Sequence, residues 1–242
     1  MPFTSVVLSL FPGIGMLDAA FEAEGFCVVR GPDLLWGGDV SKFHPPMGRF
    51  NGVIGGPPCQ SFSKIGNVNR ARWGNDCIMP DQIPEFIRCI KEAQPDWFLM
   101  ENVPEAPVPT VDGYVVKTEV IRDVWVGGET NRLRRFTFGV AARIVGCLAQ
   151  VNGWRPETLA LHTVDAERTV SWKGAVDWKG SRAREGYRSL ADMLELQGFP
   201  RDFLDHCPFT VDAAKKAVGN GVPLAMGRAV AAAVRRATTM EV

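Results

Sequence analysis

Cys59 stands in the stretch GGPPCQSFS, at the end of the apolar run NGVIGG, which is typical of a buried strand. Gly55 and Gly56 let the chain turn sharply, while Pro57 and Pro58 fix φ near about −65° and remove two backbone donors. The thiol is therefore expected to be held rigidly at the carboxyl end of a strand, where open α/β sheets bind their ligands. This mount favours a nucleophilic cysteine over a small buried packing cysteine.

Two further patterns place charged side chains at strand ends. Glu101 and Asn102 end a second apolar run, DWFLMENV, and a glutamate there could protonate or hydrogen-bond a substrate ring nitrogen. Arg132 and Arg134 are two residues apart and so lie on the same side of an extended segment, which suits a phosphate or an anionic intermediate. The alternatives are an exposed strand-end acid and an ordinary solvated face.

The stretch LFPGIGM, residues 10–16, is a glycine turn between a β-branched apolar segment and a segment with helical apolar spacing. Such a turn lets a ligand approach the backbone at a helix N-terminus. Asp18 occupies the place of the third glycine of the dinucleotide fingerprint, which disfavours NAD. After the next strand, Asp33 could hold a ribose and Trp36 could stack on a base; a turn acid and a surface-packed indole are equally good interpretations.

Strand and helix patterns alternate along the chain. We expect strands at 5–11, 26–30, 51–56 and 96–103, and helices at 16–25, 80–94, 189–199 and 222–237. This order predicts an α/β fold with a mostly parallel sheet that is covered by helices on both faces. Only eight residues separate Arg30 from Asp39, fewer than the about 10–12 that a crossover with a helix needs, so that unit must be abbreviated.

Composition limits the classes of protein that need be considered. With 242 residues, 46% of them hydrophobic and 22% charged, the chain fits one globular domain with a small insert. It has no basic start and no run of about 18 apolar residues, so we expect a soluble, cytoplasmic protein without a secretion signal. Six cysteines without a CxxC pair indicate neither a metal site nor a disulfide framework. Residues 131–188 hold 11 Lys and Arg against 5 Asp and Glu, so one part of this neutral chain is basic.

Six motifs occur in one order along the chain: LFPGIG, PPCQ, ENV, the RxR run at 132–134, RSLADMLELQGFP at 188–200 and AVGNGVPLAMGRAV at 217–230. In this order the chain resembles the C5-cytosine DNA methyltransferase family over nearly its whole length, except roughly 141–187. The resemblance implies an open, mostly parallel, Rossmann-like methyltransferase sheet formed by residues 1–140 and 188–242. It also implies a small target-recognition insert at 141–187.

The resemblance also implies a reaction: transfer of a methyl group from S-adenosylmethionine to C5 of cytosine in double-stranded DNA, with S-adenosylhomocysteine as product. Cys59 would attack C6 as a thiolate, Glu101 would stabilise protonation at N3, and Arg132 and Arg134 would complete the catalytic set. C5 then attacks the sulfonium methyl group, and loss of the C5 proton and of Cys59 frees the product. Because C6 is inaccessible inside a stacked duplex, the base must be flipped out.

The family's binding residues carry over to matching positions in this chain. The cofactor contacts implied are Phe11, Pro12, Gly13, Ile14, Gly15, Met16, Asp33, Trp36, Asp39, Pro57, Asn220 and Val222. The DNA contacts implied are Pro58, Gln60, Ser61, Ser63, Lys64, Arg70, Arg72, Asn102, Arg155, Arg182 and Arg184. The polar, glycine-dotted segment 61–75 would be a mobile loop that closes over the base. The turn at Asn220 should lie beside the first glycine turn.

The chain departs from the family's pattern at a few places. Ser9 replaces an acidic residue, Met16 a glycine and Thr130 a glutamine, and the segment 31–39 is short. The insert has three tryptophans, each followed by a cation, which suit either a phosphate backbone or a miniature core: Trp154, Trp172 and Trp178. Within 141–187 Gln150 and Asn152 are the only amides, so we expect a short or relaxed target of about two to four base pairs.

Three alternatives stay open. The same catalytic residues would serve a tRNA cytosine-C5 methyltransferase. A non-catalytic DNA-binding regulatory module is disfavoured because both Cys59 and Glu101 are present. A cysteine-dependent hydrolase would need a histidine partner, and no motif around His44, His162 or His206 suggests one. We expect a monomer of restriction-modification or phage type, with a cognate restriction enzyme as an open partner and no membrane.

Overall fold

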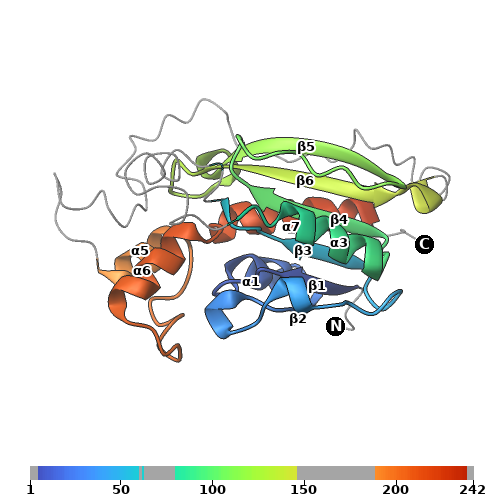
Figure 1. Cartoon of the computed structure of the whole chain (residues 1–242). Helices are drawn as coiled ribbons and strands as arrows, with labels where there is room; N and C mark the ends of the chain where they lie inside the picture. Colours follow the sequence, from blue (N-terminus) through green and yellow to red (C-terminus); the bar gives the residue numbers. More distant parts are fainter. Residues whose placement is uncertain (1–4, 60–61, 63–79, 146–188, 239–242) are drawn as a thin grey trace.

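The computed structural model describes residues 5–59, 62, 80–145 and 189–238 of the 242. Its centre is a six-stranded sheet in the order β2-β1-β3-β4-β6-β5 (Figure 1). The strands are β1 (Val6–Leu10), β2 (Cys27–Arg30), β3 (Gly52–Gly55), β4 (Trp97–Asn102), β5 (Tyr114–Arg122) and β6 (Leu133–Ala141). The pairings among β1 to β4 are parallel, whereas β6 runs antiparallel to both β4 and β5. The predicted α/β class with a mostly parallel sheet is confirmed.

Five α-helices and three short 3₁₀ turns accompany the strands in the described part of the chain. They are α1 (Met16–Ala23), α3 (Ile83–Ala93), α5 (Leu190–Leu196), α6 (Val211–Asn220), α7 (Leu224–Thr238), η1 (Leu34–Trp36), η2 (Val40–Lys42) and η5 (Asp123–Val126). One core cluster joins α1 and α7 to the sheet, and a second joins α3 to its other face. Figure 1 shows α3 in front of the sheet and α7 behind it. The expected cover on both faces is therefore present.

Strand β4 shows why the sheet is buried on both sides. All six of its residues are buried, and alternate side chains enter opposite clusters: Trp97 packs toward α1 and α7, Phe98 toward α3. Neighbouring strands leave space for these rings, because a Cβ at Gly52 would collide with Trp97 and one at Gly139 with Phe98. An apolar run without alternation is thus the mark of a two-sided strand, as the sequence predicted.

Residues 31–51 connect β2 to β3 without an α-helix. The two short turns η1 and η2 take the place of one, which confirms that this unit is abbreviated. The sequence predicted β6 only as an extended segment around Arg132 and Arg134. Two further elements were not predicted: β5, whose nine residues are mostly half-exposed, and α6, which starts at the cap Thr210. Strand β5 lacks the continuous apolar run of a buried strand, and α6 carries few large apolar side chains.

A third core cluster joins α5 and α6 to the start of α1. The turn after α6 lies against the first glycine turn, because a Cβ at Gly221 would collide with the Met16 side chain. Further along α7, Arg228 Nε makes an ion pair with Glu24 at 2.9 Å. The expected neighbourhood of the two turns is confirmed, and the C-terminal helix packs beside the N-terminal one.

The predicted insert lies almost entirely outside the described residues. Strand β6 runs to Ala141, and the next described element is α5. The N-terminus of this helix is closed by a capping box that Ser189 and Asp192 form. The division into a catalytic part and an insert at 141–187 stays a prediction.

Among the described residues, no single helix is long and apolar enough to cross a membrane. By length and composition alone, α6 and α7 pass that test together, as a pair bent by 41°.

We predict that Ile90→Ala lowers the free energy of unfolding by about 2–5 kcal/mol, because Ile90 is fully buried between α3 and the sheet and truncation leaves a cavity. Ile87→Ala, on the same helix but only partly buried, should cost clearly less. Urea unfolding followed by circular dichroism measures both. Equal losses would contradict this packing of α3.

Candidate functional site

The mount of Cys59 is built by two glycines that touch neighbouring strands. A Cβ at Gly55 would lie 2.7 Å from the Leu10 carbonyl oxygen, and one at Gly56 would lie 3.0 Å from Glu101 Oε2. The chain after β3 can therefore pass close to both β1 and β4 only because these positions carry no side chain. The thiol is brought to the carboxyl edge of the sheet, half-buried, as the sequence predicted.

Asn102 ties this mount to β4. Its Nδ2 donates to the Pro57 carbonyl at 3.1 Å, and its Oδ1 accepts from the Val103 amide at 2.9 Å. We expected Asn102 to contact DNA, but its side chain is buried and both polar atoms are used within the protein. Its position corrects that expectation in favour of holding the cysteine segment in place.

Glu101 and Arg134 form the central charged pair of the site. Arg134 Nε lies 2.6 Å from Glu101 Oε1, and their side chains are only 15% and 11% exposed. Strands β4 and β6 pair antiparallel and so bring the two side chains to the same edge. A buried carboxylate needs such a partner, because an isolated charge would be strongly destabilising there.

The charges at this edge act on the Cys59 thiol. Burial raises its pKa, and the negative charge of Glu101 raises it further, whereas Arg134 and Arg132 lower it. The four predicted catalytic residues are therefore close enough for the charges of Glu101, Arg132 and Arg134 to act on Cys59. Neutralising Glu101 would remove the second of the two causes that raise this pKa, whereas burial of the thiol would remain.

Arg132 and Arg134 do not form the joint anion site that their spacing suggested. Arg132 donates from Nη1 to the Gly219 carbonyl at 2.6 Å and from Nη2 to the Asn220 carbonyl at 2.8 Å, which caps the C-terminal end of α6. Burial lowers the pKa of Arg132 to about 9. The guanidiniums have separate partners because β6 begins between Glu101 on one side and the end of α6 on the other.

Asp123 is a residue of the site that the sequence analysis missed. Its Oδ2 accepts from the Thr130 amide at 2.9 Å and from Thr130 Oγ1 at 2.6 Å, all of them buried. Burial raises the pKa of Asp123. This contact fixes the connection between β5 and β6, and so the position of Arg132. It also gives Thr130, which replaces the family's glutamine, a structural role. The sequence does not reveal this contact, because Asp123 lies seven residues before Thr130 and only the pairing of β5 with β6 brings the two together.

The glycine turn between β1 and α1 has an unusual backbone. Phe11, Gly13 and Gly15 all have positive φ, at 54°, 55° and 80°. Asp33 Oδ2 accepts from the Gly13 amide at 2.8 Å, and Trp36 Nε1 donates to the Gly13 carbonyl at 2.7 Å. Both side chains that were predicted to bind a nucleoside therefore also fasten the turn.

These residues fit an adenosine group. Each Asp33 oxygen accepts one bond, Oδ2 from Gly13 and Oδ1 from Leu35, and so keeps a lone pair for a ribose hydroxyl. The Trp36 indole is 50% exposed and its ring centroid lies 5.1 Å from that of Phe209, which the sequence analysis did not single out. One face of an aromatic ring is thus offered beside a carboxylate at the turn.

The remaining cofactor residues are placed less directly. Asp39 caps η2, whereas Val222 is 5% exposed and packs in the core, so its side chain is not offered to a ligand. The Asn220 carbonyl is taken by Arg132.

Ser9 and Asp18 explain a departure from the family's pattern. Ser9 Oγ donates to Asp18 Oδ1 at 2.5 Å, and Arg30 Nε lies 3.0 Å from Asp18 Oδ2. Asp18 is fully buried, and burial raises its pKa to about 6. The acid missing at position 9 is therefore supplied from the first turn of α1, where the sequence analysis noted only that a glycine was absent.

Nine predicted contacts with DNA fall outside the described residues: Gln60, Ser61, Ser63, Lys64, Arg70, Arg72, Arg155, Arg182 and Arg184. The loop 61–75 and the insert stay predictions for the same reason. Within the described ranges, no group of three or more His, Cys, Asp or Glu could hold a metal ion.

The comparisons with known proteins agree with this geometry. The family model "C-5 cytosine-specific DNA methylase" matches residues 37–118, which include both Cys59 and Glu101. Over these residues the match confirms the resemblance to the C5-cytosine DNA methyltransferase family that the motifs indicated.

Two curated members of the family illustrate the similarity. Type II methyltransferase M.NgoPII of Neisseria gonorrhoeae is 33% identical over 115 residues, which are 40% of this chain and 33% of that protein. Orphan methyltransferase M.SPRI of Bacillus phage SPR is 27% identical over 172 residues, 57% of this chain and 38% of that protein. The chain spans about a third of the length of the curated relatives it matches first.

Solved structures share the fold. A DNA modification methyltransferase encoded within an E. coli prophage superposes with a TM-score of 0.60 at 15% identity, covering 96% of this chain and 98% of that one. DNMT2 of Spodoptera frugiperda gives a TM-score of 0.59 at 14% identity, covering 93% and 98%. At this identity the likeness concerns the fold alone.

We predict opposite effects of two substitutions on the Cys59 thiol. Arg134→Gln removes a cation that lowers the pKa of Cys59, so alkylation by iodoacetamide should need a higher pH. Glu101→Gln removes an anion that raises this pKa, so alkylation should begin at a lower pH. Peptide mass spectrometry across a pH series gives the midpoint, with fully buried Cys89 as the unreactive reference. A shift in the same direction for both variants would contradict the assigned electrostatics.

Proposed function

We propose that the protein is a DNA (cytosine-5)-methyltransferase that uses S-adenosylmethionine. The observation that carries the proposal is the rigid mount of Cys59 beside the buried Glu101–Arg134 pair, at one edge of the sheet. The match of residues 37–118 to the family model supports the same reaction. The regulatory alternative would have no use for an ion pair held against a reactive thiol.

The proposed chemistry follows from the weak nucleophilicity of cytosine C5. The Cys59 thiolate adds to C6 while Glu101 stabilises a proton at N3, so that the electrons are available at C5. C5 then takes the methyl group from the sulfonium, the C5 proton is lost to solvent, and the bond from Cys59 to C6 breaks. Covalent catalysis divides one difficult substitution into easier steps.

Glu101 and Cys59 are coupled in this scheme. The charge of Glu101 disfavours the thiolate, so the thiolate forms more easily while Glu101 is neutral and holds the proton that it shares with N3 of the flipped base. Arg134 keeps Glu101 oriented toward the mount through their ion pair. The Cys59 thiolate is therefore favoured when a flipped base is bound to Glu101, which limits reaction of the thiol when no base is bound.

S-adenosylmethionine supplies the methyl group on its sulfonium when it is bound. The turn at Phe11–Met16 would cradle it through backbone groups, as a helix N-terminus with positive-φ residues can. Asp33 would bind the ribose hydroxyls, and the exposed indole of Trp36 would stack on the adenine. Pro57, Asn220 and Val222 would lie close to the cofactor, although the carbonyls of Pro57 and Asn220 accept hydrogen bonds from Asn102 and Arg132.

Double-stranded DNA is the proposed substrate because the matching family model and curated relatives are named as DNA or type II methyltransferases. The base would be flipped out, and the target is proposed to be short or relaxed. Structural neighbours that are named Dnmt2 keep the RNA alternative in view. Incubation with DNA and tRNA side by side decides between them. A cytoplasmic monomer, with or without a cognate restriction enzyme, completes the proposal.

The covalent step can be tested with DNA that contains 5-fluorocytosine, whose C5 fluorine cannot leave as a proton does. Wild-type protein with S-adenosylmethionine should form an adduct that survives denaturing electrophoresis. Cys59→Ala should form none, whereas Cys89→Ala, a change at a buried thiol on α3, should retain it. An equal adduct yield with Cys59→Ala would refute the assignment.

Glu101→Gln is predicted to lower turnover by about 10²–10⁴-fold, the range typical of acid–base groups, while DNA affinity is largely retained. The amide keeps the size of the side chain but cannot supply a proton at N3. Single-turnover methylation and a DNA-binding titration measure the two effects. Turnover near that of the wild type would show that Glu101 is only a structural partner of Arg134.

A further inference from the structure

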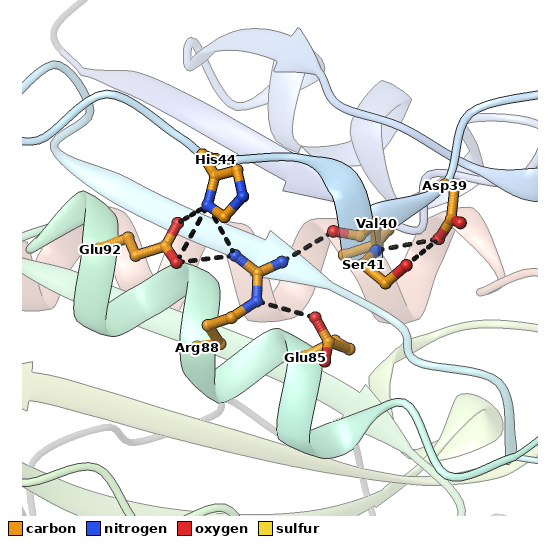
Figure 2. Close-up of polar contacts among 7 residues, drawn as sticks. All are labelled: Asp39, Val40, Ser41, His44, Glu85, Arg88 and Glu92. Atoms are coloured by element: carbon orange, nitrogen blue, oxygen red, sulfur yellow. Dashed lines mark hydrogen bonds and ion pairs between the residues drawn. The ribbon is translucent and has the colours of Figure 1, made fainter.

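Arg88 on α3 is the centre of a polar network that reaches across to the connection between β2 and β3 (Figure 2). Its Nε donates to Glu85 and its Nη1 to Glu92, both at 2.8 Å, and these acids lie on the same helix. Its Nη2 donates at 2.8 Å to the carbonyl of Val40 in η2. His44 Nδ1 lies 3.1 Å from Glu92 on the same side. Glu85 and Glu92 thus orient the Arg88 guanidinium toward the carbonyl of Val40.

That peptide group belongs to the segment in which a crossover helix is missing. Residues 31–51 contain only η1 and η2, so few regular backbone bonds hold this segment against the sheet. Val40 is 4% exposed and anchors it through its side chain in the cluster beneath α3. The bond from Arg88 anchors the same residue through its backbone, which gives the turn two attachments to one helix.

Asp39 immediately precedes the anchored residue. Its Oδ1 accepts from the Ser41 amide at 3.0 Å and from Ser41 Oγ at 2.7 Å, so the direction of the carboxylate depends on where the peptides of η2 lie. Figure 2 shows Asp39, Val40 and Ser41 together at the end of the network. Movement of the Val40 carbonyl would therefore turn the Asp39 side chain.

We propose that Arg88 is a positioning residue of the cofactor site: it fixes η2 so that Asp39 is presented to the adenosine part of S-adenosylmethionine. This inference rests on the proposed function, and on a contact between Asp39 and the cofactor that the resemblance to the methyltransferase family implies. The carboxylates of Glu85 and Glu92 hold the guanidinium in the one orientation that reaches Val40, and a planar fork with three occupied nitrogens is not replaced by lysine.

The charge state of Arg88 agrees with this role. Burial works to lower the pKa of Arg88, but its bonds with Glu92 and Glu85 outweigh burial and raise it. The guanidinium therefore stays charged, and its bond to the Val40 carbonyl is a charge-assisted one.

The test is the binding of S-adenosylmethionine to the full chain, measured by calorimetry without DNA. Arg88→Met, and separately Arg88→Lys, should weaken binding about tenfold, the scale of one lost charge-assisted hydrogen bond. In methylation assays they should raise KM for the cofactor and leave kcat little changed. Lys91→Ala is the matched control: Lys91 is on the same helix as Arg88, its exposed ion pair is with Asp112 outside that helix, and the variant should bind as the wild type does.

A double-mutant cycle separates positioning from general support of the fold. If Arg88 acts through Asp39, Arg88→Met should weaken binding no further in a protein that already carries Asp39→Asn. Additive losses, or unchanged binding by both Arg88 variants in folded protein, would overturn the inference. If Arg88→Met does not fold by circular dichroism, Arg88→Lys carries the cycle.

Different results would refute the proposed function and the role of Arg88. A wild-type protein that does not bind S-adenosylmethionine would refute the proposed function and this inference together. A wild-type protein that binds it, with Arg88 variants that bind equally well, would refute only the role of Arg88.

Discussion

The buried ion pair between Glu101 and Arg134 is the interaction on which the site depends. Both groups lie at the end of strands that are buried along most of their length, so neither could be retained there as an isolated charge. The pair orients Glu101 against Gly56, and the approach of these two residues defines where the chain can leave β3. Cys59 follows three residues later, in a position set by that contact.

The same edge of the sheet is held by several buried polar contacts, two of which join segments far apart in the sequence. Asn102 fastens Pro57, Asp123 fastens Thr130, and Arg132 closes the end of α6. Because a buried donor or acceptor without a partner is costly, such contacts restrict the site to a single arrangement. The result is a cysteine segment with little freedom to move relative to Glu101, Arg132 and Arg134.

Around the first glycine turn and in the connection between β2 and β3, short segments replace regular structure. Asp33 and Trp36 close the glycine turn, and the Arg88 network anchors η2 where the connection between β2 and β3 lacks a helix. A helix would have held these residues through its own backbone bonds and its packed face. Without one, individual charged and polar side chains have to supply that rigidity, which makes single substitutions there informative.

The sequence by itself determined the α/β class, most of the strands and helices of the core, and the position of Cys59 and Glu101 at the ends of neighbouring strands. These follow from local signals: apolar runs that must be buried on both sides, and a mount of glycine and proline that restricts the backbone. The tertiary structure alone decided the partners of the polar groups. Arg132 and Arg134 share a side in an extended chain, yet one binds Glu101 and the other the end of α6, because burial forces each charge onto the nearest acceptor that folding brings within reach.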